Sequence, residues 1–103
     1  MKKGRKSDYG KPRWDLLPWS QAEEVVKVLT FGASKYKPNN WRHIKDGERR
    51  YFAAALRHLA ASANGEDLDS ETGFPHYSHA ICSLFFAAWH RKRYGKVKKT
   101  FVF

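Results

Sequence analysis

The sequence predicts an all-α fold, a compact single domain over residues 1–103 with three main helices, ordered loops and basic termini. Two observations predict it: apolar residues recur at helical spacing in three segments, and capping residues or glycines bound each segment. The strand-like alternation of KVKKTFVF at the C-terminus has no obvious partner strand. Three amphipathic helices of this length bury little apolar surface alone, so we expect a homo-oligomer, either a dimer or a tetramer.

Residues 1–18 are expected to form an irregular basic arm, because glycine and proline interrupt them repeatedly. The first helix is predicted from Gln21 to about Phe31. Ser20 is the expected N-cap, with Glu23 three residues later in a capping box, and Gly32 fits a C-cap. The expected buried stripe consists of Ala22, Val25, Val26 and Leu29.

A polar loop over 32–47 should precede the second helix, predicted from Glu48 to Asn64. Pro75 is well placed to open the third helix, which should continue to about Arg93. The apolar spacing predicts that these two helices bury Phe52, Ala55, Leu56, Leu59 and Ala63 on the second, and Ile81, Leu84, Phe85 and Ala88 on the third.

The net charge of +10 is concentrated at the two ends. Residues 1–13 carry +5 and residues 91–103, the basic tail, carry +6, whereas residues 14–90 carry −1. Basic ends are typical of nucleic-acid binding, but they also attract polyanionic small molecules such as nucleotides, or serve simply as solvated tails. The sequence has neither an apolar run of membrane-spanning length nor a signal-peptide pattern, which predicts a cytoplasmic protein.

The lone cysteine, Cys82, cannot form an internal disulfide and is expected to be a small buried apolar residue.

The segment GEDLDSETGFPHYSHA, residues 65–80, predicts a metal site. Four of the ten acidic residues fall within six positions, and such a group repels itself unless cations neutralise it. Oxygen and imidazole ligands together suit Mg²⁺ or Mn²⁺. EF-hand and HEXXH spacings are absent, and one cysteine excludes thiolate-based zinc fingers. The alternative, interaction with the dipole of the following helix, explains one or two of the acids. His76 and His79 could be paired ligands beside these acids, joined by His58 if helices two and three lie side by side.

A second group of residues, FGASKYKPNNW over 31–41, has the chemistry of a nucleotide site. A lysine can neutralise phosphate, an asparagine can read a base or ribose, aromatic rings can stack on a base, and guanidinium groups suit phosphate oxygens. The alternative is an ordered loop whose aromatic rings plug the small core. The candidate substrate-binding residues are Lys35, Tyr36, Asn40, Trp41, Arg50 and Arg57.

The order GKPRWDLLP, VLTFGASKY, NNW, RHLAA, GEDLD, ETG and HYSHA resembles phage and bacterial dATP/dGTP diphosphohydrolases, which are related to the all-α MazG-like nucleotide pyrophosphatases. The resemblance covers roughly residues 8–90. It implies a helical, metal-dependent oligomer that hydrolyses purine deoxynucleoside triphosphates to monophosphate and pyrophosphate. It also implies that metal is held by Asp69, Glu71, His76 and His79, together with His58 and Glu66. A carboxylate such as Glu71 then positions or deprotonates water, with Asp69 as a second catalytic residue.

The chain departs from the MazG-like pattern in its acidic motifs. Those enzymes carry EExxE and ExxD helices, whereas here EEVVK lacks the third acid and HYSH stands where ExxD is expected. Two alternative functions therefore remain open: a phage protein that binds a nucleotide without catalysis, and a basic nucleic-acid-binding module. No helix-turn-helix or zinc-finger motif supports the second.

Overall fold

The structure is a computed structural model that describes residues 3–95. Three α-helices, α1 (Trp19–Lys35), α2 (Gly47–Ala63) and α3 (His76–Tyr94), make up most of the described chain, together with two short 3-10 helices, η1 (Trp14–Leu16) and η2 (Asn40–His43). The only β-type pairing among the described residues is an isolated bridge between Leu68 and Pro75. The predicted all-α fold with three main helices is confirmed, while the strand-like tail lies outside the described residues.

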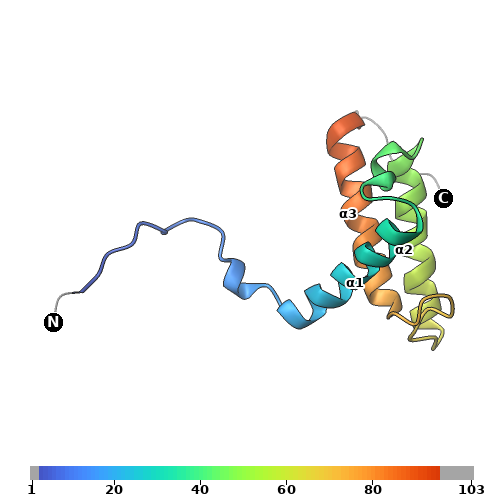
Figure 1. Ribbon diagram of the computed structural model, residues 1–103, viewed down its shortest axis with the longest axis horizontal. Coiled ribbons are helices and arrows are strands. Elements are labelled where there is room, and N and C mark those ends of the chain that lie inside the picture. Colours follow the sequence, from blue (N-terminus) through green and yellow to red (C-terminus); the bar gives the residue numbers. More distant parts are fainter. Residues whose placement is uncertain (1–2, 96–103) are drawn as a thin grey trace.

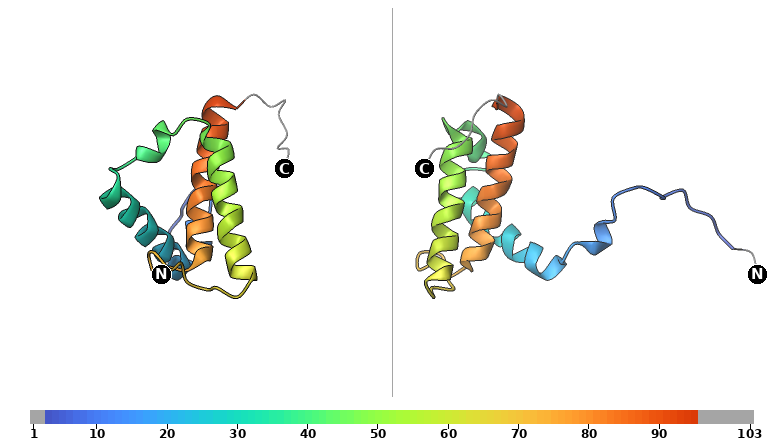
Figure 2. Two further views of the ribbon diagram at one scale, coloured as in Figure 1. Left: turned by 90° about the vertical axis from the view of Figure 1, so that its right-hand side faces the viewer. Right: turned by 180° about the vertical axis from the view of Figure 1, so that it is seen from behind.

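Helices α2 and α3 form an antiparallel hairpin, and α1 crosses against α3 (Figures 1 and 2). The segment that precedes α1 extends away from the helices, so the longest dimension of the molecule is 59 Å. Its aromatic side chains are open to solvent, with Tyr9 fully exposed and Trp14 71% exposed. In the described part of the chain, no helix has the length and apolar character needed to cross a membrane.

The first helix is longer at both ends than predicted. It starts at Trp19 behind an extended Pro18, with no side-chain cap, so the predicted capping box at Ser20 is wrong. The predicted C-cap at Gly32 is also wrong, because Gly32 lies within the helix and its carbonyl accepts the N–H of Tyr36, the actual C-cap. The helix stops just before Pro38 because a proline disfavours helical backbone at the residue before it. Helices α2 and α3 end within one residue of the predicted positions.

The core of the single chain is thin and consists of small or medium-sized side chains. Val25 and Val28 of α1 pack against Cys82 of α3, with Phe74 and Phe86 beside them. Cys82 is 4% exposed, as predicted, and burial raises the pKa of its thiol to about 11. No large described side chain is fully buried.

The prediction of the buried faces is wrong for most of α2 and α3. Only Ala55 of the predicted α2 face is fully buried, and Val26 of α1 is exposed. The side of α3 that faces inward is made of small and polar residues such as Ser78, Ala80 and Ser83. Their small size lets α3 approach α2 closely, so most residues of the two predicted apolar faces remain outside. These exposed residues are Leu56, Leu59, Ala63, Ile81, Leu84, Phe85 and Ala88.

At the opposite end of the hairpin from the acidic loop, His90 holds α2, α3 and the preceding loop together. It is 4% exposed, and its Nε2–H donates to the Trp41 carbonyl over 2.8 Å. Its ring also stacks on Tyr51 with centroids 6.0 Å apart. The ring lies directly against Gly47, where a Cβ would come within 2.3 Å of His90 Nε2.

Replacing Gly47 by alanine is therefore expected to destabilise the protein by about 1–3 kcal/mol, the usual cost of overpacking. Chemical denaturation at fixed protein concentration measures this change. The matched control is Gly32→Ala, because a Cβ at this mid-helix position meets nothing within 4 Å. The control should raise the free energy of unfolding by about 0.5–1 kcal/mol. Equal stability of the two variants would contradict the packing described for His90.

Candidate functional site

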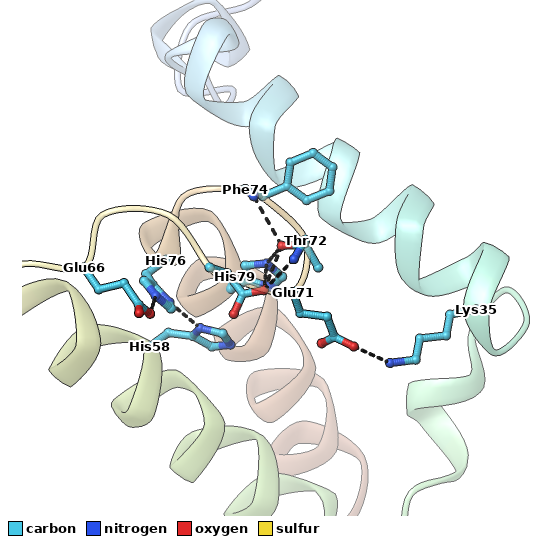
Figure 3. A network of polar contacts seen from close by, with 9 residues as sticks. Lys35, His58, Glu66, Glu71, Thr72, Phe74, His76 and His79 are labelled. Carbon is cyan, nitrogen blue, oxygen red and sulfur yellow. Dashed lines mark hydrogen bonds and ion pairs between the residues drawn. The ribbon is translucent and has the colours of Figure 1, made fainter.

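Three histidines from two helices converge beside the acidic loop (Figure 3). His58 projects from α2, whereas His76 and His79 come from the first turn of α3. The Nδ1 atoms of His58 and His76 are 2.9 Å apart, and the rings of His58 and His79 stack with centroids 4.6 Å apart. Helices α2 and α3 thus lie side by side, which was the condition for predicting His58 as a metal ligand.

Asp69 and Thr72 fold the acidic loop against α3. The backbone N–H and the hydroxyl of Thr72 both donate to Asp69 Oδ2, each over 2.9 Å. The hydroxyl oxygen also lies 2.7 Å from His79 Nε2 and accepts the N–H of Phe74. Sequence analysis missed Thr72, although an Asp followed three residues later by a hydroxyl residue is a known turn pattern.

The remaining acidic side chains of the loop take different directions. Glu66 points to the cluster, with its Oε2 2.5 Å from His76 Nε2. Glu71 points across to α1, where the Lys35 ammonium donates to it over 3.1 Å (Figure 3). Asp67 contributes its backbone carbonyl, which accepts the N–H of His76. The predicted acidic group is therefore divided between the histidines and α1.

The hydrogen bonds assign the imidazole tautomers. A carboxylate only accepts hydrogen bonds, so neutral His76 donates Nε2–H to Glu66 and its Nδ1 accepts the Nδ1–H of His58. His58 Nε2 then keeps a free lone pair, whereas the Nδ1 lone pair of His76 becomes available to a cation only when the hydrogen bond from His58 is given up. Because Thr72 donates its hydroxyl proton to Asp69, its oxygen accepts Nε2–H from His79. A carboxylate behind a histidine is the arrangement that orients metal-binding imidazoles.

The environment favours the protonation states that metal ligands need. Burial lowers the pKa of His58 and of His79, and in His58 the neighbouring histidines lower it further. Burial opposes ionisation of Asp69, but the two hydrogen bonds from Thr72 and the nearby His79 and His58 together bring its pKa below the usual range. At neutral pH the cluster therefore offers neutral imidazoles of His58 and His79 beside an ionised carboxylate.

The donor atoms of His58, Asp69 and His76 fit one divalent cation. One ligand atom from each lies within 4.8 Å of the other two. Donors that share a cation are at most about 5 Å apart, twice a metal–ligand distance of roughly 2.0–2.6 Å. Three of the six predicted ligands thus converge. Glu66 contacts His76 behind them, His79 Nε2 is bonded to Thr72, and Glu71 lies away from the cluster on Lys35.

A cavity of about 660 Å³ lies next to this cluster, between α1, the loop that follows it and α3. Thr72, His79 and Glu71 form its edge on the side of the histidines. Four of the predicted substrate-binding residues line the same cavity, namely Lys35, Tyr36, Asn40 and Trp41. Tyr51, Cys82, Ser83 and Phe86 also line it and were not anticipated as site residues.

The aromatic residues of the cavity differ in their freedom to stack on a ligand. Trp41 is stacked on Phe86 with centroids 4.4 Å apart, and the Arg42 guanidinium lies 5.1 Å from its ring centroid. The structure therefore favours the alternative for Trp41, a ring that plugs the core. Tyr36 is 58% exposed and keeps an accessible ring, with Lys35 Nζ 5.2 Å from the centroid.

Arg50 and Arg57 do not line this cavity. They lie two turns apart along one side of α2, as their spacing predicted, and line a separate groove of about 400 Å³. The two hollows have Ile44 and Tyr51 in common. The guanidinium groups of Arg50 and Arg57 therefore lie outside the cavity that Lys35 lines, and Tyr51 stands between the two hollows.

Comparison with known proteins supplies independent information about this chain. The family described as dATP/dGTP diphosphohydrolase, N-terminal, matches residues 1–100. A Salmonella phage PMBT28 protein named dATP/dGTP diphosphohydrolase is 37% identical over 86 residues, which are 84% of this chain and 29% of that protein. The chain thus spans less than a third of the length of this relative. No solved structure matches the chain. Since the family match covers nearly every residue, the chain belongs to the dATP/dGTP diphosphohydrolase N-terminal family.

Proposed function

We propose that this chain hydrolyses purine deoxynucleoside triphosphates to the monophosphate and pyrophosphate with the help of a divalent cation. The observation that carries the proposal is a cavity, edged by Glu71, Thr72 and His79, that lies next to the converging donors of His58, Asp69 and His76. The name of the phage relative supports the substrate class, because that protein is called a dATP/dGTP diphosphohydrolase.

The cavity and its edge suggest how a nucleotide would lie. The apolar inner wall, which includes Leu29 and Phe86, suits a base, and the exposed Tyr36 ring can stack on it. Asn40, the first residue of η2, also lines the cavity and can hydrogen-bond the base or ribose. The phosphates then extend toward the cationic Lys35 and the edge at His79, whose ring stacks on that of the candidate ligand His58.

The proposed reaction is attack of water on the α-phosphorus. A divalent cation held by His58, Asp69 and His76 would neutralise phosphate oxygens and favour ionisation of water. Glu71 would accept the proton of the attacking water, and Lys35 would stabilise charge on the phosphates. The water oxygen bonds to the α-phosphorus while the bond to the α–β bridging oxygen breaks, and pyrophosphate leaves with that oxygen.

Imidazole and carboxylate together favour Mn²⁺ or another transition ion over Mg²⁺, which prefers oxygen ligands. We therefore expect Mn²⁺ to support the reaction at lower concentration than Mg²⁺. This order follows from the two histidines among the three converging donors.

Chromatography of products from each of the four deoxynucleoside triphosphates with Mn²⁺ or Mg²⁺ tests the proposal. Monophosphate and pyrophosphate should form from a purine nucleotide. Lys35→Ala should lower kcat/KM about 10–100-fold, because a charge-assisted phosphate contact contributes about 1.5–3 kcal/mol. Lys27→Ala is the matched control, an exposed lysine of the same helix whose partner is Glu24. Equal rates for the two variants, or no turnover by the wild type, would refute the assignment.

A second candidate function is nucleotide binding without catalysis. It is favoured by the 29% coverage of the phage relative, which leaves most of that protein unmatched. The test is equilibrium binding of dATP and dGTP measured alongside product formation. Saturable binding that Lys35→Ala weakens, with no product under either metal, would favour this second candidate over the hydrolase.

A further inference from the structure

The groove of about 400 Å³ along α2 takes no part in the proposed function. Its lining residues include three arginines, Arg49, Arg50 and Arg57, and no aspartate or glutamate. The groove therefore carries positive charge that no acidic side chain of its own lining offsets. A hollow with this charge is suited to an anion.

Two of the three guanidinium groups have no carboxylate as a partner. Arg49 Nε donates to Asp46 Oδ2 over 2.6 Å, so the charge of Arg49 is neutralised within the chain. Arg50 Nη1 donates to the backbone carbonyl of Lys45 over 3.2 Å, which fixes its position and leaves its charge uncompensated. Over residues 3–95, neither Arg50 nor Arg57 forms an ion pair, and both side chains are exposed.

The spacing of these two arginines indicates the length of the anion. Seven residues are nearly two full turns, so Arg50 and Arg57 lie on one side of α2 with their backbones about 10.5 Å apart along the helix axis. Ala53 and Ala54 lie between them on the same side, and their small side chains leave the groove open. Side chains that start this far apart reach the two ends of a chain of phosphates more readily than they converge on a single phosphate.

We propose that this groove is a second anion site, which binds a chain of two or more phosphates without a metal ion. Guanidinium groups bind phosphate oxygens through paired hydrogen bonds, whether the chain is inorganic or belongs to a nucleotide. The proposal stands independently of the proposed function, because none of the three arginines lines the cavity and binding here requires no turnover.

The wall between the groove and the cavity keeps the two sites apart. Ile44 and Tyr51 line both hollows. The Tyr51 ring is held in place by Phe86 and His90, with centroids 5.0 Å and 6.0 Å away. A ligand in the groove would therefore lie beside the cavity, on the other side of Tyr51, and both sites could be occupied at once.

The size of the groove and the charge around it favour a small ligand over a nucleic-acid backbone. Its volume falls in the range of about 300–1,000 Å³ that is usual for small-molecule sites. Residues 14–90 carry a net charge of −1, so the body of the domain does not attract a long polyanion. The positive charge of the groove is local, as a short chain of phosphates requires.

Calorimetric titration of the full chain with tripolyphosphate, in the presence of chelator, tests the proposal. Lys35→Ala removes the cationic side chain of the cavity, and this variant should still bind one tripolyphosphate per chain. Adding Arg57→Ala to it should weaken that binding about tenfold or more, because a charge-assisted contact is lost. Arg57→Lys should restore only part of the affinity, since an ammonium group keeps the charge without the planar fork. The matched control in the same background is Arg93→Ala, which removes an exposed arginine of α3 outside the groove.

The variants are expected to fold, because the Arg57 side chain is exposed, and their Tm values check this. Equal affinities after Arg57→Ala and Arg93→Ala would mean a general attraction of anions and would overturn the proposal. So would loss of all binding in Lys35→Ala alone, because one site would then include both hollows. Tighter binding of an oligothymidylate than of tripolyphosphate, with the same dependence on Arg57, would assign the groove to nucleic acid instead.

Competition in the Lys35→Ala variant distinguishes the two sources of the phosphate chain. Displacement of tripolyphosphate by dATP would support the phosphates of a nucleotide as the occupant. Displacement by pyrophosphate but not by dATP would support an inorganic chain. Neither result depends on hydrolysis, so the groove can be confirmed or refuted separately from the reaction proposed for the cavity.

Discussion

Replacing His76 by alanine is expected to abolish saturable binding of a divalent cation. His76 supplies one of the three converging donors and lies between Glu66 and His58 in the hydrogen-bond chain. Glu66→Gln, which alters only the residue behind the ligand, should weaken binding about 10–100-fold, and loss of the ligand itself should cost more. Calorimetric titration of chelator-treated protein with Mn²⁺ measures both affinities.

Stability gives a second measure of the same site. At a metal concentration 100 times the dissociation constant, the wild type should gain about 2.7 kcal/mol of stability, and His76→Ala should gain almost none. His43→Ala is the matched control, because His43 is exposed in η2 and lies outside the cluster. If His76→Ala bound Mn²⁺ as tightly as His43→Ala, the cluster would not be a metal site.

Local sequence signals predicted the helices well and the site in part. Glycine at 65 and proline at 75 bound α2 and α3 within a residue, because their effects on the backbone are local. His76 and His79 share a turn of α3 for the same reason. The contact of His58 with His76 depends on how α2 packs on α3. Local sequence signals do not determine this packing, so the contact could be predicted only on the condition that the two helices lie side by side.

The faces of the helices were harder to predict because their burial depends on which partner each one meets. The apolar stripe with Ile81 and Leu84 was expected to enter the core, but the small residues on the other side of α3 pack against α2 instead. Trp41 shows the same difficulty, since an aromatic residue in a polar loop can stack on a ligand or on Phe86.

Acidification of the metal-free protein is expected to destabilise it in two stages. The pKa values of His58 and His79 are lowered, mainly by burial, below the value of 6.5 that applies to an unfolded chain. Below that pH the unfolded state binds more protons than the folded state, so stability is fully present above it and falls as pH decreases. The pKa of Asp69 is also lowered, and its contribution is lost as pH falls below 3.8 and through its folded-state value.

The first stage can be assigned to the histidines by substitution. His58 faces His76, His79, Asp69 and Arg57, and these neighbours remain in His58→Gln while the titrating group is removed. Tm measured with chelator from about pH 8 to pH 5 should fall less in His58→Gln and His79→Gln than in the wild type, whereas His43→Gln should follow the wild type. Saturating Mn²⁺ should raise the whole curve and steepen its acid limb, because protons compete with the metal for the same imidazoles. A wild-type Tm that stayed constant down to pH 5 would mean that the folded imidazoles are not held neutral, and the ligand set proposed from them would fail with it.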